Sequence, residues 1–145
     1  MIIRYMREAD LPQAAAIEAA CFHENWSKEL LTSSMEKSWN FFLAAEEDGR
    51  LAAYGAVSVI AGEGEIQRIA VLPAFRRQGL GRKLLGAMVN AARQKGAGAM
   101  TLEVRESNAP AIKLYISAGF KTEARRAGYY RNPQEDALIM WKRSL

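Results

Sequence analysis

Glycine and arginine residues gather in the stretch FRRQGLGRKLL, residues 75–85, immediately before an apolar helical rhythm begins. Gly79 and Gly81 lack a Cβ atom, so a ligand can approach their backbone closely. A helix that begins near Leu80 would offer unpaired N–H groups and the positive end of its dipole. Fixed positive charge would come from three arginines: Arg76, Arg77 and Arg82. The stretch therefore predicts a diphosphate site, although basic loops at helix starts also occur without any ligand.

Two familiar nucleotide-binding motifs match this stretch poorly. A P-loop requires GxxxxGK[ST], but Gly81 is followed by Arg82 and Lys83, with no hydroxyl group for magnesium. A dinucleotide fingerprint requires a third glycine, where Leu84 stands. No acidic residue follows at a strand end about 20 positions later, where such sites bind a ribose. The residues favour a diphosphate site of another kind.

Glu103 is the strongest candidate for acid–base chemistry, because it interrupts an apolar run between Leu102 and Val104. A carboxylate in such a place is costly unless it has a partner or a role. Burial would raise its pKa from about 4.3, which suits a general base. Pairing with Arg105 or a nearby lysine explains the residue equally well. Glu65 is a rival base, but its place beside a turn predicts a side chain in solvent.

Cysteine and histidine offer little further chemistry. Cys21 is the only cysteine and His23 the only histidine, so neither a disulfide framework nor a zinc cluster can form. We expect Cys21 to be a structural residue on a helix rather than an acyl-accepting nucleophile. No metal ion is expected.

Periodicity, caps and turns predict one α+β domain over residues 1–145, with a mixed, mostly antiparallel sheet flanked by helices. Strands are expected at Ile2–Arg7, Asn40–Glu47, Leu51–Ala61, Glu65–Leu72, Ala99–Val104, Phe120–Tyr130 and Ala137–Trp141. Helices are expected at Ala9–Phe22, from Ser27 to about Met35, at Leu80–Lys95, and between Asn108 and Gly119. Ser27 and Asn108 are candidate N-caps, and Asp48-Gly49 is a strong hairpin signal. The order is β-αα-βββ-α-β-α-ββ.

Charge is distributed unevenly along the chain. Residues 1–75 hold 6 basic and 11 acidic side chains, whereas residues 76–131 hold 12 basic and 3 acidic ones. This asymmetry favours two different ligands, although a polarised, solvated surface would look the same. There is no apolar run of about 18 residues and no signal-peptide pattern, so we expect a cytoplasmic protein without membrane contact.

The motif RRQGLG, residues 76–81, matches the [QR]xxGx[GA] signature of the GNAT acetyltransferase superfamily. IAVLP, residues 69–73, resembles the central strand of that family, which splays open to receive the pantetheine arm of acetyl-coenzyme A. The predicted layout is similar to the GNAT order over essentially the whole chain. The resemblance implies acetyl-coenzyme A as acetyl donor, bound by Ile69, Ala70, Val71, Arg76, Arg77, Gln78, Gly79, Leu80, Gly81, Arg82, Asn108 and Tyr115.

The second half resembles one branch of the superfamily, the ribosomal-protein-alanine N-acetyltransferases. The resemblance is carried by LEVRESNAPAIKLYISAGF (residues 102–120) and YYRNPQEDALIM (residues 129–140). It implies direct acetyl transfer, in a ternary complex, to the α-amino group of an N-terminal alanine of a small-subunit ribosomal protein. Glu103 would be the general base, and Tyr115 the general acid facing the thioester sulfur. Trp26, Tyr129 and Tyr130 would line the acceptor site.

Plainer roles remain open for these aromatic residues. Trp26 also fits packing, and the tyrosine pair fits an ordinary hairpin. Tyr115 shares a predicted helix face with Ile112 and Ile116, which fits a core position.

Other functions also remain open at this point. The same cofactor could serve a lysine side chain or a small-molecule amine, because a set of acidic residues suits any cationic acceptor: Glu18, Glu24, Glu29, Glu36 and Glu46–Asp48. A coenzyme A sensor without catalysis is less favoured, since Glu103 and Tyr115 are present. A nucleic-acid-binding module would use the basic segment. The basic residues gather at a helix start, however, so we expect no direct nucleic-acid contact. A monomer or weak oligomer is expected.

Overall fold

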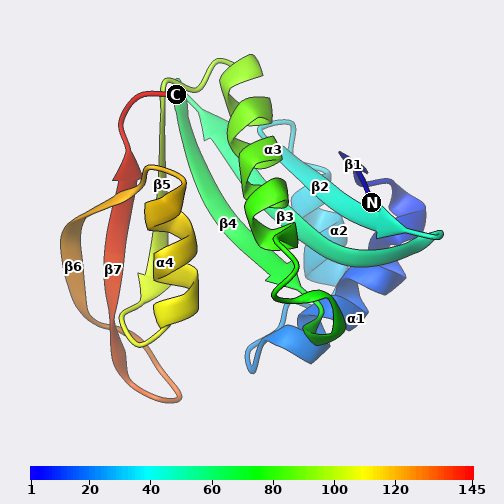
Figure 1. The fold of residues 1–145 in the computed structure, drawn as a ribbon, viewed down its shortest axis with the longest axis horizontal. Helices are drawn as coiled ribbons and strands as arrows, with labels where there is room; N and C mark the ends of the chain where they lie inside the picture. The colour runs from blue at the N-terminus through cyan, green and yellow to red at the C-terminus, as the bar shows by residue number, and fades with distance from the viewer.

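The computed structural model describes residues 1–145 as one seven-stranded sheet with helices on both faces (Figure 1). The strand order across the sheet is β1-β2-β3-β4-β5-β7-β6. The strands are β1 (Ile2–Tyr5), β2 (Asn40–Glu47), β3 (Arg50–Ile60), β4 (Glu63–Val71), β5 (Ala99–Arg105), β6 (Lys121–Tyr130) and β7 (Glu135–Lys142). The helices are α1 (Leu11–Cys21), α2 (Lys28–Met35), α3 (Leu80–Gln94) and α4 (Ala109–Ser117), with 3-10 turns at Glu8–Asp10 and Pro73–Phe75. The predicted α+β layout is confirmed.

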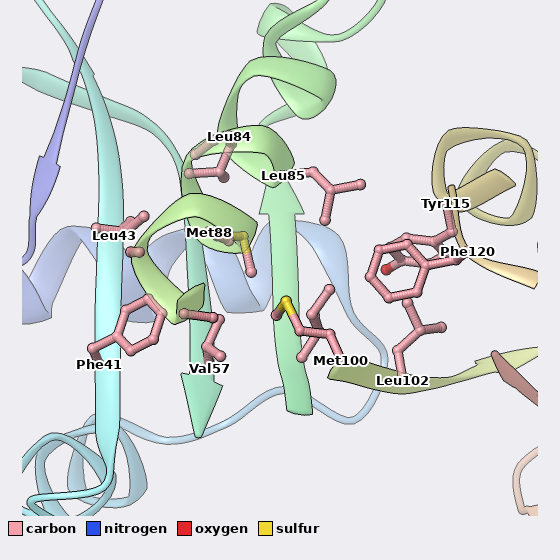
Figure 2. Close-up of a cluster of buried hydrophobic side chains, with 14 of the residues drawn as sticks. Phe41, Leu43, Val57, Leu84, Leu85, Met88, Met100, Leu102, Tyr115 and Phe120 are labelled. Carbon is pink, nitrogen blue, oxygen red and sulfur yellow. The ribbon is translucent and has the colours of Figure 1, made fainter. Parts of the chain in front are cut away.

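Two apolar cores hold the helices to the sheet. On one face, Leu84, Leu85 and Met88 of α3 pack among sheet residues that include Phe41, Leu43 and Val57 (Figure 2). On the other face, α1 and the neighbouring α2 cover β2, β3 and β4 with a second cluster. Figure 1 shows α3 and α4 together in front of the sheet, with α1 and α2 behind it. None of the four α-helices combines the length and apolar character that crossing a membrane requires.

Local sequence signals account for most element boundaries. The Ser27 hydroxyl accepts a hydrogen bond from the Leu30 N–H (3.1 Å), and the Asn108 side chain accepts one from the Ala111 N–H (3.3 Å). Asp48 and Gly49 have positive φ angles of 51° and 78°, as a tight hairpin turn requires. The predicted caps and hairpin are therefore confirmed.

The first helix begins later than predicted. The expected range Ala9–Phe22 is divided into a 3-10 turn and α1, which starts at Leu11 and ends at Cys21. Asp10 causes the division, because its carboxylate accepts hydrogen bonds from the Arg7 N–H (2.7 Å) and from the Arg4 guanidinium (2.7 and 2.9 Å). These bonds hold a separate turn before the helix.

The sheet opens between β4 and β5. This is its only parallel pair, and the pairing covers just three positions, beginning at Glu63 with Ala99 and ending at Glu65 with Thr101. Beyond these positions β4 continues to Val71 and β5 to Arg105, but the two strands no longer pair with each other. Both strands lead into helices at this end, β4 into α3 and β5 into α4 (Figure 1). The opening thus adjoins two helix N-termini.

Candidate active site

The loop between Phe75 and α3 forms one side of the opening. Arg77 and Gly79 both adopt left-handed backbone conformations, with φ of 64° and 77°. Gly79 is the N-cap of α3, and no side chain caps that end. The first backbone hydrogen bond of the helix is donated by Lys83 to the Gly79 carbonyl (3.1 Å). The N–H groups of the first turn are therefore free to bind an anion.

Gly81 faces the space between α4 and β4. A Cβ atom built there would lie 3.5 Å from Leu114 Cδ2 and 3.9 Å from Val71 Cγ2, which are ordinary van der Waals distances. The protein therefore has room for a side chain here, but that side chain would take up the space that a ligand needs. Arg77 and Arg82 are exposed and form no ion pair within the protein. Bare backbone donors with two unpaired guanidinium groups fit the pyrophosphate of acetyl-coenzyme A.

Arg76 makes a structural contact that its sequence context did not reveal. Its Nε donates to the Val71 carbonyl (2.9 Å), and its Nη2 lies 3.5 Å from Cys21 Sγ. Cys21 also donates to the Val71 carbonyl (3.4 Å). Arg76 thus ties the loop to the end of β4, whereas Gln78 donates to the Ala74 carbonyl of the preceding 3-10 turn (3.3 Å). Contacts from either residue to a cofactor remain a prediction.

Glu103 lies on β5, where its neighbours Leu102 and Val104 are buried under α3 and α4. Because side chains alternate along a strand, Glu103 projects from the opposite face, which carries α1 and α2. Its Oε2 atom is enclosed and accepts no hydrogen bond, and the nearest cation is Arg126 Nη1 at 3.8 Å. An enclosed carboxylate oxygen without a partner is a ready proton acceptor.

The alternative role for Glu103, as the partner of Arg105, does not match the ion pairs of the structure. Arg105 instead contacts Glu135, with 3.2 Å between Nη1 and Oε1. The two residues are two positions apart on β5 and therefore share a face, but Arg105 makes its ion pair with Glu135 and none with Glu103.

Several titratable groups converge on Glu103. Partial burial and the negative charge of Glu103 raise the pKa of Glu65 and of Tyr129. Burial and the same carboxylate raise the pKa of Tyr130 to about 12. Glu65 is exposed, as predicted from its place beside a turn. Glu103 is therefore the more enclosed of the two carboxylates.

Tyr115 lies on the other side of the opening. It projects from α4 toward β5 beside Phe120, with the rings edge to face at 6.0 Å between centroids (Figure 2). Its hydroxyl makes no hydrogen bond within the protein and is not among the enclosed polar atoms. Burial, with a smaller effect of Tyr130, raises the pKa of Tyr115, so the phenol is protonated at neutral pH. Ile116 is 58% exposed and does not share its face, because adjacent helix positions point about 100° apart.

Aromatic residues border the opening on the Glu103 face. Tyr129 and Tyr130 end β6 with their rings 5.0 Å apart, and Trp26 lies half-buried in the loop between α1 and α2. The two segments meet where Asn132 Nδ2 approaches Glu24 Oε1 (3.4 Å). These predicted acceptor-site residues are thus brought to one border of the opening, and their contact with an acceptor remains a prediction.

The sequence reading of Glu18 as part of an acidic surface is wrong. Glu18 is fully buried and accepts hydrogen bonds from Arg68 Nη2 (2.9 Å), the Trp26 N–H (2.7 Å) and the Tyr54 hydroxyl. Its helical spacing from Leu11 placed it on the apolar face of α1, and that signal could have revealed its burial. Arg68 on β4 and Tyr54 on β3 carry no sequence signal of this role, because the residues beside them do not indicate a buried partner.

Residues 11–120 match the family model of the acetyltransferase (GNAT) family. The chain belongs to this family. It is 38% identical, over 95% of its length and 94% of the relative's, to the [ribosomal protein bS18]-alanine N-acetyltransferase of Escherichia coli K12. The crystal structure of the E. coli enzyme superposes with a TM-score of 0.91 over 99% of this chain and 94% of that one, at 35% identity. Ard1 from Thermoplasma volcanium gives a TM-score of 0.91 at 26% identity, over 99% and 97% of the two chains.

Membership of the family settles the class of enzyme and its acetyl donor. The protein is an acetyltransferase that uses acetyl-coenzyme A. Its loop of backbone donors at α3 and the opening between β4 and β5 agree with that donor.

Proposed function

We propose that this enzyme acetylates the N-terminal α-amino group of a protein, namely the N-terminal alanine of a small-subunit ribosomal protein. The observation that carries the proposal is the enclosed Oε2 of Glu103, which accepts no hydrogen bond, at the opening between β4 and β5. Glu103 would act as proton acceptor on the face of the sheet that Trp26 and Tyr130 border. The other face of the sheet carries α4. The name of the E. coli relative supports the choice of acceptor.

The proposed chemistry assigns one proton transfer to each face of the sheet. Bound acetyl-coenzyme A supplies an acetyl thioester. Glu103 accepts the proton of the acceptor ammonium, which makes the amine nucleophilic. Tyr115, protonated at neutral pH, donates its phenolic proton to the departing thiolate sulfur from the α4 face. Both substrates are bound together, and the amine attacks the thioester carbonyl carbon directly. The C–S bond breaks as Tyr115 protonates the sulfur, and the second proton of the nitrogen passes to solvent as the amide forms. Exchange with solvent then returns Glu103 to a carboxylate and Tyr115 to a phenol.

An α-amino group is the acceptor that this base can activate more easily. It titrates near about 8, compared with about 10.4 for a lysine side chain, so less free energy is needed to deprotonate it at neutral pH. The loop from Phe22 to Ser27 and the end of β6 approach one another through Glu24 and Asn132.

Mass spectrometry of a peptide panel tests the proposal. Peptides that begin with Ala, Ser or Met, each carrying one internal lysine, are incubated with enzyme and acetyl-coenzyme A beside a matching peptide whose N-terminus is blocked. We expect a single acetyl group on the terminal amine of the alanine peptide and none on the blocked peptide. Acetylation of the lysine in the blocked peptide would contradict the proposal.

A further inference from the structure

Arg68 of β4 contacts the segment that connects α1 with α2 at several points. Its Nη2 lies 2.9 Å from both Glu18 Oε1 and the Glu24 carbonyl oxygen. Its guanidinium carbon lies 4.1 Å from the ring centre of Phe22 and 4.8 Å from that of Trp26. Cation–π contacts at these distances are attractive. One side chain thus joins the central strand to most of this loop.

Glu18 completes the attachment from the other side. Its buried carboxylate accepts the Trp26 N–H (2.7 Å) and the Tyr54 hydroxyl, in addition to Arg68. Trp26 is therefore held through its backbone by Glu18 and through its ring by Arg68. Residues 22–27 form neither helix nor strand, so these contacts replace the regular hydrogen bonds that order other parts of the chain.

Arg68 also acts on the aromatic border of the opening. The positive charge of Arg68 lowers the pKa of the Tyr130 phenol, whereas the negative charge of Glu103 raises it. The Arg68 side chain is 19% exposed, and its Nε atom is enclosed without a partner. The guanidinium thus lies between the loop and the aromatic border of the opening.

We propose that Arg68, through its pair with Glu18, is the positioning residue of the acceptor site. Together they hold the loop of residues 22–27 in place, so that Trp26 forms a fixed wall before the peptide arrives. A loop ordered in advance loses little entropy on binding, which favours affinity for the acceptor. The inference rests on the proposed function, because it assigns this loop to the acceptor peptide. Arg68 acts through Trp26 and takes no part in proton transfer.

Arg68→Met removes the charge and the stacking but keeps the length of the stem. Because Arg68→Met leaves the buried Glu18 carboxylate without its cationic partner, the double variant Glu18→Gln/Arg68→Met is made beside it. The matched control is Arg4→Met, since Arg4 is 20% exposed and pairs with the 7% exposed Asp10, outside the opening. Arg68→Lys serves as the conservative variant, which keeps the charge without the planar fork.

Steady-state kinetics and hydrogen exchange measure the effect. In both Arg68→Met variants we expect the KM for the alanine peptide to rise by about 10-fold or more, because the peptide must now order the loop. The KM for acetyl-coenzyme A and kcat should stay within about 2-fold. Amide exchange in residues 22–27 should accelerate. Arg68→Lys should fall between these variants and the wild type, and Arg4→Met should leave peptide KM and loop exchange unchanged.

Three results would overturn the inference. One is an unchanged peptide KM in the folded double variant. Another is loop exchange at the wild-type rate in that variant. The third is a similar rise in peptide KM for Arg4→Met, which would indicate general destabilisation. If the wild type acetylates no peptide N-terminus, the proposed function fails by itself. Exchange of residues 22–27 then decides the role of Arg68: acceleration supports it and an unchanged rate refutes it.

Discussion

Replacing Glu103 by glutamine removes the proposed base with almost no change in shape. The Oε2 atom accepts no hydrogen bond, so an amide nitrogen in its place breaks none. Its nearest cation, Arg126, is 53% exposed and lies 3.8 Å away, and such pairs contribute about 0–1 kcal/mol. We therefore expect the unfolding free energy to change by about 1 kcal/mol or less. Affinity for coenzyme A should also stay unchanged, because the loop that we expect to bind its pyrophosphate lies before α3, away from Glu103.

The effect on turnover should be far larger. A positioned general base contributes about 10²–10⁴-fold to rate. At about 1.36 kcal/mol for each factor of ten, this corresponds to roughly 2.7–5.4 kcal/mol of activation free energy. Part of the loss should recover as pH rises beyond about 8, where the α-amino group of the peptide is already neutral. Initial rates of coenzyme A thiol release, followed from pH 6 to about pH 9, measure both effects.

Glu65→Gln is the matched control for this experiment, since Glu65 is the other carboxylate near the opening. We expect it to keep most of its activity. Glu103→Gln should also lower the pKa of Glu65, because the charge of Glu103 helps to raise it. A nuclear magnetic resonance titration of the Glu65 side chain reports that shift. A Glu103→Gln enzyme that turns over at nearly the wild-type rate at pH 7 would refute the assignment of the base.

Three further outcomes are expected. Gly81→Val should fold, because a Cβ there is 3.5 Å from the nearest atom, yet calorimetry should detect no coenzyme A binding. Tyr115→Phe should keep its melting temperature and cofactor affinity while turnover falls by about 10²-fold; normal turnover with chemistry rate-limiting would exclude the acid role. The hydrogen bond from Arg4 holds the pKa of Asp10 below its usual value, so this pair stabilises the fold above about pH 4. In chemical denaturation, the stability advantage over Arg4→Met should shrink as pH falls below that range.

The sequence by itself determined the features that depend on neighbouring residues. Ser27 and Asn108 cap helices by accepting bonds from N–H groups three residues later, and Asp48-Gly49 turns a hairpin through its own backbone preference. The free donors at Gly79 follow from a glycine at a helix start. Such interactions close within a few residues, so their signals survive in a linear reading.

Only the tertiary structure decided what the buried charges contact. Glu18 and Arg68 are 50 positions apart, so helical spacing can indicate that Glu18 is buried but cannot name Arg68 as the partner that it meets once α1 packs on the sheet. The same packing directs Arg76 to the Val71 carbonyl. Contacts between distant segments likewise leave Oε2 of Glu103 enclosed without a hydrogen bond. The free energy of a buried charge depends on lost solvent and on distant partners, and neither is written in the residues beside it.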